Sequence, residues 1–311
     1  MPEKNRLMPS FAKEGKSSSF IHDEPTPFRL ISIATIGVLA VSLAAIFIRW
    51  CQAPALAIAA YRLCISSLVL IVLGYRKWPV LLQNLESREW RIAAISGLFL
   101  AIHFGAWISS LEMTSVASSV VLVSTSPFWA ALGAWLFLKA RIQRFFVFGF
   151  LLAFAGMIVI ASQGSNHQDS FAGNALALIG AIGGAGYMLC GRYLRAKLDT
   201  LSYVMLAYTF AGVFLLLLVL ASGTPLSNFS WQTYGLFLLI ALVPQLVGHT
   251  SFNWALKYLS TPVVSTIMLG EPVFATIFAF LLLSEIPSLS QVAGCLLILL
   301  GVALSIWSDK S

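Results

Sequence analysis

Apolar segments of roughly 20 residues follow one another along nearly the whole chain, and each is long enough for an α-helix to cross a bilayer. Hydrophobic residues make up 59% of the sequence and charged residues only 10%. The mean hydropathy is +0.89, and soluble domains carry about 25% charged residues. The sequence therefore predicts an all-α integral membrane protein without a sizeable soluble domain.

We expect ten transmembrane helices joined by short connections. Their predicted ranges are 29–48, 55–74, 92–111, 117–138, 145–162, 172–190, 201–221, 233–254, 262–283 and 289–307. The preceding residues, 1–28, are polar and rich in proline and serine, a composition typical of a disordered tail. This tail is too polar for a signal peptide.

The ninth predicted span, 262–283, contains a single charged residue, Glu271, followed directly by Pro272. A carboxylate in mid-bilayer costs roughly 2.5–3.5 kcal/mol on insertion scales, so it indicates a functional site. Proline removes a backbone donor and breaks or kinks a helix, so we expect unpaired backbone beside the carboxylate. A charge next to a helix break at mid-depth is typical of transporter binding sites.

An earlier part of the chain matches this region at an offset of 145 residues, which carries Pro127 onto Pro272 and Ser126 onto Glu271. The other identical pairs are Leu111 with Leu256, Ser115 with Ser260, Gly149 with Gly294, and Gly156 with Gly301. Similarity at about half the chain length indicates a duplicated unit. We predict two five-helix repeats, at 29–162 and 172–307.

The basic residues predict the orientation of the chain. All but two of the 19 Lys and Arg residues lie in the terminal segments or in alternate loops between the spans; the exceptions are Arg49 and Arg62. By the positive-inside rule, both termini are expected in the cytoplasm, with the protein in the cell inner membrane. This explains the pI of 9.4 better than nucleic-acid binding, which we do not expect. Because each repeat has an odd number of helices, the repeats must be inverted relative to each other.

With these features, the chain resembles the EamA-type branch of the drug/metabolite transporter superfamily from about Arg29 to Trp307. Three short motifs carry the resemblance besides the ten spans. They are Pro54 followed by Arg62, the pair Ser126 and Pro127, and the run LGEPVFATIFAFLLLSE that ends at Glu285.

The resemblance implies two inverted repeats and a secondary carrier of small organic metabolites, commonly an amino-acid exporter. It does not identify the substrate. One departure is Ala140, which stands where many members of the family close the fourth helix of the first repeat with a glutamate. The role of that glutamate in the first repeat is therefore not expected here.

Six side chains are candidates for lining a substrate cavity at the interface of the repeats. They are Arg62, Trp107, Ser126, Tyr187, His249 and Glu271. Glu271 is the expected centre. It can bind a substrate ammonium or exchange a proton. Alternatively, it pairs with Arg62 or bonds the backbone of a neighbouring helix and only holds the bundle together. Arg62 can attract a substrate carboxylate or bond a backbone carbonyl. Histidine and aromatic side chains in a bundle often only pack, so that alternative also stays open.

Other function classes fit the sequence less well. A membrane-embedded enzyme needs paired carboxylates, a nucleophile with its base, or a metal cluster, and no such pattern is visible. A channel is expected to show a filter or rings of polar residues. No catalytic residue, cofactor or metal is predicted, and without a GxxxxGK[ST] motif the energy must come from a gradient unless transport is facilitated. A facilitated or proton-coupled permease for another metabolite or drug remains an alternative, and a homodimer remains possible beside the expected partners, substrate and lipid.

Overall fold

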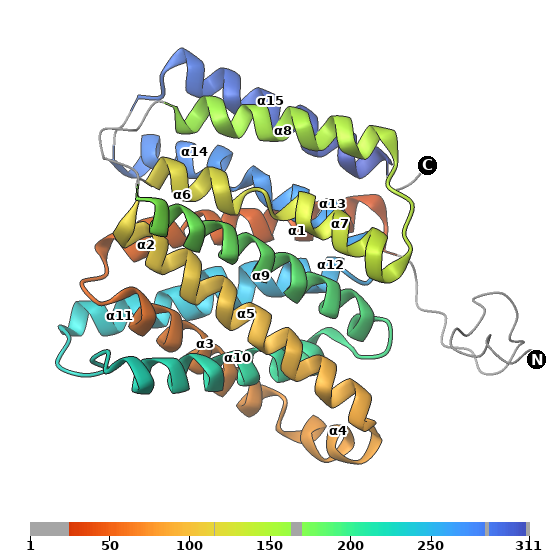
Figure 1. The fold of residues 1–311 in the computed structure, drawn as a ribbon, viewed down its shortest axis with the longest axis vertical. Helices are drawn as coiled ribbons and strands as arrows, with labels where there is room; N and C mark the ends of the chain where they lie inside the picture. Colours follow the sequence, from red (N-terminus) through yellow and green to blue (C-terminus); the bar gives the residue numbers. More distant parts are fainter. Residues whose placement is uncertain (1–24, 115, 163–169, 284–285, 309–311) are drawn as a thin grey trace, which may run out of the picture.

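The computed structural model of the chain describes residues 25–114, 116–162, 170–283 and 286–308. Regular structure in these residues is entirely helical (Figure 1). Residues 1–24 of the predicted tail 1–28 lie outside the described residues, and so does Glu285.

In the first half of the chain, two of the apolar spans are each divided between two consecutive helices. The helices are α1 (Pro27–Ser42), α2 (Ala44–Trp50), α3 (Ala55–Leu73), the short η1 (Tyr75–Lys77), α4 (Trp78–Asn84), α5 (Ser87–Met113), α6 (Val116–Val123), α7 (Ser126–Leu138) and α8 (Arg144–Ala161).

The second half has the same kind of organisation, with its own interrupted spans. The helices are α9 (Phe171–Arg195), α10 (Thr200–Ser222), α11 (Trp231–Ile240), the π-helix η2 (Ala241–His249), α12 (Thr250–Ala255), α13 (Thr261–Ile267), the 3₁₀-helix η3 (Met268–Gly270), α14 (Glu271–Leu283) and α15 (Leu289–Ser308).

By length and hydropathy, nine helical segments of the described chain can cross a membrane, and a tenth apolar helix, Arg144–Ile160, is shorter. These segments follow the order and approximate ranges of the ten predicted spans. The all-α membrane architecture is therefore confirmed, while the count of ten stays a prediction.

Two predicted helix boundaries are wrong. Helix α5 begins at Ser87, before the predicted 92, and α9 continues to Arg195, past the predicted 190. Charged residues do not end these helices because they find partners. Glu86 and Glu89 form a capping box at the start of α5, and Arg195 Nε donates to the Asn253 carbonyl at 3.0 Å.

Helices α8 and α15 lie side by side and join the two halves (Figure 1). A Cβ atom added to Gly149 would lie 2.7 Å from the carbonyl oxygen of Gly301, and one added to Gly156 would lie 2.5 Å from that of Gly294. Gly149 in α8 contacts the later Gly301 of α15, whereas Gly156 contacts the earlier Gly294, so the two helices are antiparallel. The offset of 145 residues exchanges these two contacts, as a two-fold axis between inverted repeats requires.

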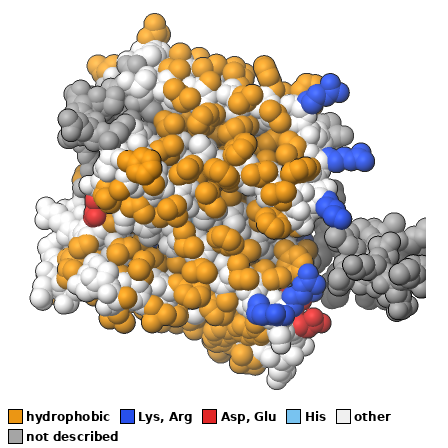
Figure 2. All heavy atoms as spheres, viewed as in Figure 1, with side chains coloured by type: hydrophobic (Ala, Val, Ile, Leu, Met, Phe, Trp, Pro, Cys, Tyr) orange, Lys and Arg blue, Asp and Glu red, His pale blue; other side chains and the backbone are white. Residues whose placement is uncertain are grey.

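Charge is distributed unevenly between the two ends of the bundle. Figure 2 shows a broad apolar surface over the middle of the molecule, with Lys and Arg side chains gathered along one edge. This edge is the end at which α1 begins and α15 ends (Figure 1). We call it the basic end.

Candidate functional site

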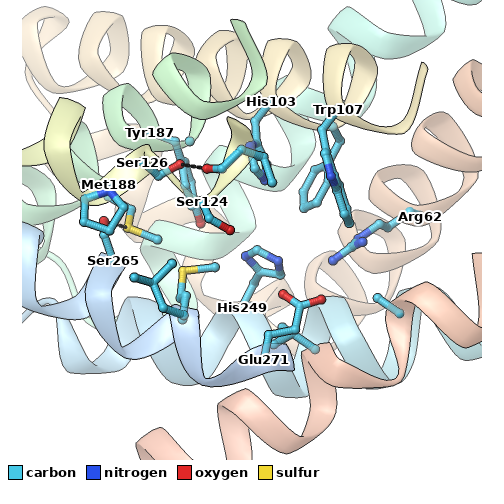
Figure 3. A pocket seen from close by; sticks show the side chains of 18 residues that line it. Arg62, His103, Trp107, Ser124, Ser126, Tyr187, Met188, His249, Ser265 and Glu271 are labelled. Carbon is cyan, nitrogen blue, oxygen red and sulfur yellow. Dashed lines mark hydrogen bonds between the residues drawn. The ribbon is translucent and has the colours of Figure 1, made fainter. Parts of the chain in front are cut away.

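A cavity of about 80 Å³ lies inside the bundle, and all six predicted candidates line it (Figure 3). They are Arg62 from α3, Trp107 from α5, Ser126 from α7, Tyr187 from α9, His249 from η2 and Glu271 from α14. The first three belong to one half of the chain and the last three to the other. The cavity therefore lies between the halves, and substrate binding by these side chains stays a prediction.

Interruptions in the spans bring backbone and side chains to this cavity. Span nine changes from α-helix to 3₁₀-helix over Met268–Gly270, and Glu271 follows at the first position of α14. The Glu271 amide bonds the Met268 carbonyl, and the hydroxyl of Ser42 donates to the Glu271 carbonyl at 2.9 Å. The expectation of unpaired backbone is therefore wrong for these two carbonyls, because the 3₁₀ geometry and Ser42 satisfy them.

Arg62 is the largest charged side chain in the cavity wall and is only 1% exposed. Its Nε donates to Oε1 of Gln245 at 2.6 Å. Its guanidinium carbon lies 4.0 Å from the ring centroid of Phe104, a cation–π contact. These two contacts fix the plane of the guanidinium group within the bundle.

Three buried donors around this group have no hydrogen-bond partner among the described residues. They are Nη1 of Arg62, Nε2 of Gln245 and Nε1 of Trp107. A buried polar group without a partner costs about 1–3 kcal/mol. This side of the site is therefore rich in donors and lacks acceptors.

The carboxylate of Glu271 points into the cavity, on the side that faces Arg62 and His249 (Figure 3). The ion pairs found in the described part of the chain are Lys77 with Asp199 and Lys197 with Glu89, so Glu271 does not pair with Arg62. No side-chain hydrogen bond joins Glu271 to another described residue. An ionised carboxylate accepts hydrogen bonds only, so this side of the cavity offers acceptors.

Two histidines, His103 and His249, also line the cavity. His103 Nδ1 lies 2.8 Å from the carbonyl oxygen of Gly180, and its ring is 6.5 Å from that of His249. Glycines in α9 permit this close approach, since a Cβ atom on Gly183 would lie 2.8 Å from the amide nitrogen of His103. His249 ends the π-helix η2, and wide π-turns often occur at functional sites.

The remaining candidates are held by internal bonds. Tyr187 is 2% exposed, and its hydroxyl accepts a hydrogen bond from Asn253 Nδ2 at 2.6 Å. The Ser126 hydroxyl lies within bonding distance of two carbonyls, those of Val123 at 2.9 Å and Ala181 at 3.1 Å. Both hydroxyl oxygens can still accept a hydrogen bond from a solute.

Gln245 was absent from the predicted set, although it orients Arg62. Its signal in the sequence is an amide inside the apolar run ALVPQLVGH, directly after Pro244. A neutral amide in an apolar span indicates a functional site less strongly than a charge does, yet a buried amide also needs hydrogen-bond partners. For metal binding, the part of the chain that the structure describes contains no suitable group of three or more His, Cys, Asp or Glu residues.

Interrupted helices that surround a charged cavity between two inverted halves define a multi-pass membrane transporter. The family comparison agrees, since the model of the EamA-like transporter family matches residues 29–162 and 171–307. The chain belongs to this family.

Several relatives of known sequence are named transporters, and a solved structure shares the fold. An uncharacterized transporter of Archaeoglobus fulgidus is 25% identical over 256 residues, which cover 80% of this chain and 86% of that protein. The pseudopaline exporter CntI of Pseudomonas aeruginosa is 26% identical over 212 residues, or 68% and 73% of the two chains. A crystal structure with 18% identity superposes with a TM-score of 0.73 over 90% of this chain and 97% of that chain, which shows a shared fold.

Proposed function

We propose that the chain is a secondary exporter of small zwitterionic metabolites such as amino acids, working by alternating access between its two halves in the inner membrane. The observation that carries this proposal is the division of one cavity into a donor side at Arg62 and an acceptor side at Glu271. A molecule with both a carboxylate and an ammonium group matches the two sides at once.

The donor side favours a carboxylate. Arg62 Nη1 and Trp107 Nε1 are buried donors that lack acceptors, and both residues line the cavity. Charge-assisted hydrogen bonds to such donors are roughly twice as strong as neutral ones. Binding a carboxylate there would satisfy groups that the protein leaves unpaired.

The acceptor side favours an ammonium group. Glu271 forms no ion pair with a described residue, and its carboxylate is open to the cavity on the side that faces Arg62 and His249. The apolar lining, which includes Phe104, Met188 and Met268, suits a hydrophobic side chain on the solute.

The basic end supports an orientation of the chain in the membrane, and one relative supports a direction of transport. Its Lys and Arg side chains favour a cytoplasmic position, and the CntI relative is an exporter by name. We therefore assign the basic end to the cytoplasm and net transport to export.

The test uses inside-out membrane vesicles from cells with and without the protein, so that uptake reports export. Solutes are first chosen by comparing the metabolites of the two cell lines, with labelled amino acids as the initial panel. For each amino acid transported, we compare competition by the amine that lacks its carboxylate and by the acid that lacks its ammonium group. Loss of one charge-assisted bond costs about 1.5–3 kcal/mol, so each analogue should compete roughly 10- to 100-fold less well.

Arg62→Gln is the matched variant for the carboxylate side, because it keeps donors but removes the charge. It should transport poorly and lose the preference for the amino acid over the amine. Equal competition by amino acid and amine in the wild-type protein, or no transport of any amino acid, would overturn the proposal.

A further inference from the structure

A second cavity, of about 260 Å³, lies at the basic end between α7, α8, α9, α13 and α15. We call it the basic vestibule. Its polar lining residues are Arg141, Gln143, Arg192, Ser260, Thr261 and Ser308. Among its described lining residues both charges are positive, so the wall has no acidic group to repel an anion.

Three helices connect this vestibule with the central cavity. On α9, Met188 lines the central cavity and Arg192, one turn later, lines the vestibule. On α13, Thr261 lines the vestibule and Ser265, one turn later, lines the central cavity. Residues four apart share a helix face and differ by about 6 Å along the axis. The two cavities therefore follow each other along one face of each helix.

The third helix, α7, continues the same path. Pro127 lines the central cavity, whereas Ala134 and Leu138 line the vestibule. The positions between them include Ala130 and Ala131, both of which are buried. Small residues here leave little side-chain bulk between the cavities.

One contact lies where the two cavities approach each other along α9 and α13. The hydroxyl of Ser265 donates to Sδ of Met188 at 3.0 Å, and both side chains are buried. Figure 3 shows this pair on the side of the central cavity opposite Arg62. Methionine is unbranched and has three rotatable bonds, so a rotamer change of Met188 can open the passage without movement of a helix.

The vestibule wall is built to receive an acceptor-bearing solute. Arg192 Nη1 donates to the carbonyls of Leu256 at 2.5 Å and Leu259 at 3.2 Å, which hold its charge against the wall. Thr261 is 2% exposed, and its hydroxyl has no hydrogen-bond partner among the residues that the structure describes. Arg141 is exposed at the rim. Two positive charges around a largely apolar cleft attract anions and concentrate them locally.

We propose that the basic vestibule is a second binding site, which takes carboxylate-bearing solutes, on the route between the central cavity and the basic end, with Met188 and Ser265 as the gate. This inference rests on the proposed function, because a route requires a transported solute. Its experiment, however, uses thiol chemistry and needs no transport.

The first test measures anion preference in the vestibule of the full-length protein in detergent, with the four native cysteines replaced by alanine. A cysteine at Ser260 is reacted with a sulfonate-bearing methanethiosulfonate and with its trimethylammonium counterpart. Each rate is divided by the rate for 2-mercaptoethanol. We expect the anionic reagent to react about 10-fold faster, and Arg141→Gln to reduce this preference severalfold.

Ser222→Cys is the matched control, because it is exposed at the end of α10 away from the basic end. It should show no anion preference. A cysteine at Ser260 that does not react, that reacts equally with both reagents, or whose preference is unchanged by Arg141→Gln would overturn the proposed site.

The second test concerns the gate. A cysteine at Ser265 should react slowly with the anionic reagent, and Met188→Ala should accelerate it about 10-fold or more. Filling the vestibule with Ala134→Trp should abolish this acceleration; Gln143→Trp, at an exposed wall position, is the second blocking variant if Ala134→Trp does not fold.

Acceleration that survives both blocking variants means that the reagent reaches Ser265 from elsewhere, and the route is then wrong. Unchanged labelling in Met188→Ala means that the gate is wrong. Failure of amino-acid transport would overturn the proposed function and leave these labelling rates as they are, so the two failures are distinguishable.

Discussion

Gly149 and Gly301 bring the backbones of α8 and α15 into direct contact: a Cβ atom on Gly149 would lie 2.7 Å from the Gly301 carbonyl oxygen. Gly156 and Gly294 form the equivalent contact, and the offset of 145 residues exchanges the two pairs. Inside a membrane, association of helices depends on such close packing, because lipid is as apolar as the side chains. This contact therefore joins the halves of the transporter.

We predict that Gly149→Ala and Gly301→Ala each lower the free energy of unfolding by about 1–3 kcal/mol, the usual cost of overpacking. Gly235→Ala in α11 is the control, because nothing lies within 4 Å of its added Cβ atom. Alanine there should be neutral or stabilising by up to about 1 kcal/mol. Thermal unfolding in detergent measures all three, and equal midpoints would show that the glycine contact does not constrain the packing.

The orientation can be tested with reporters at both ends of the bundle. We predict that a green fluorescent protein fused after Ser311 fluoresces, because the positive-inside rule puts the basic end in the cytoplasm. Alkaline phosphatase inserted in the loop at Asn228, between α10 and α11, should be active, because that loop lies at the opposite end. The reverse pattern of activities would contradict the assigned orientation.

Gln245 should act as a positioning residue for Arg62. Gln245→Glu would place a carboxylate 2.6 Å from Arg62 Nε, so the arginine would be neutralised within the protein. We expect roughly 10-fold or more weaker binding of the amino acid, since a charge-assisted bond of about 1.5–3 kcal/mol is lost, and a reduced preference for it over the matching amine. Gln245→Leu should instead lower stability by about 1–3 kcal/mol, because Arg62 Nε loses its acceptor.

Competition assays in vesicles and thermal unfolding together check this role. Gln291→Glu, in the first turn of α15, is a control for adding a carboxylate elsewhere. If Gln245→Glu keeps the wild-type preference for amino acids, Gln245 does not position the arginine for binding.

An ion pair at the basic end gives a pH-dependent contribution to stability. Burial acts to raise the pKa of Asp199, but hydrogen bonds from Lys77 and Ser202 outweigh it and hold the pKa below its ordinary value of 3.8. A lowered folded pKa contributes stability above the unfolded pKa, and this contribution is lost as the pH falls through the folded value. Asp199→Asn should therefore unfold at a lower temperature than the wild type at pH 7, with the difference shrinking below about pH 4.

Asparagine also serves as a helix N-cap, so Asp199→Asn separates the charge from the cap that Asp199 provides to α10. Asp199→Ala removes both and should cost about 0.5–2 kcal/mol more for the lost cap. A difference between wild type and Asp199→Asn that stays constant from pH 7 to pH 3 would contradict the ion-pair explanation.

The sequence was sufficient to predict which charged groups meet in the cavity, because Arg62 and Glu271 lie within apolar spans, where burial without a function is costly. It did not reveal how they are held. Ser42 bonds the Glu271 carbonyl from 229 residues away, and Gln245 reaches Arg62 from a π-helix. Such bonds depend on the depth and rotation of whole helices, which a periodic apolar pattern does not specify.

The basic vestibule could not be predicted from the sequence either, for a related reason. Nothing in their own segments of sequence distinguishes Met188 and Thr261. They line the two cavities because α9 packs against α13. The basic loops around them predict an orientation in the membrane, but a charge in a loop does not indicate a cavity behind it.

Glu271 is the residue on which the transport cycle is expected to depend most. Its carboxylate faces the central cavity and has no ionic partner among the described residues. Glu271→Gln keeps the shape and can still accept hydrogen bonds, but it cannot carry charge or exchange a proton. If Glu271 binds the substrate ammonium, the variant should bind amino acids roughly 10- to 100-fold less tightly, because one charge-assisted bond of about 1.5–3 kcal/mol is lost.

The dependence on pH separates the two roles proposed for Glu271. If it also exchanges protons during transport, the rate of the wild-type protein should change with pH, and Glu271→Gln should remove that dependence. If it only binds the ammonium, Glu271→Gln should weaken binding by the same factor at every pH. Vesicle transport at matched expression, between pH 5.5 and 8.5, measures both. A variant with the wild-type rate and the wild-type pH profile would show that Glu271 has a structural role, and the proposed site would lose its acceptor side.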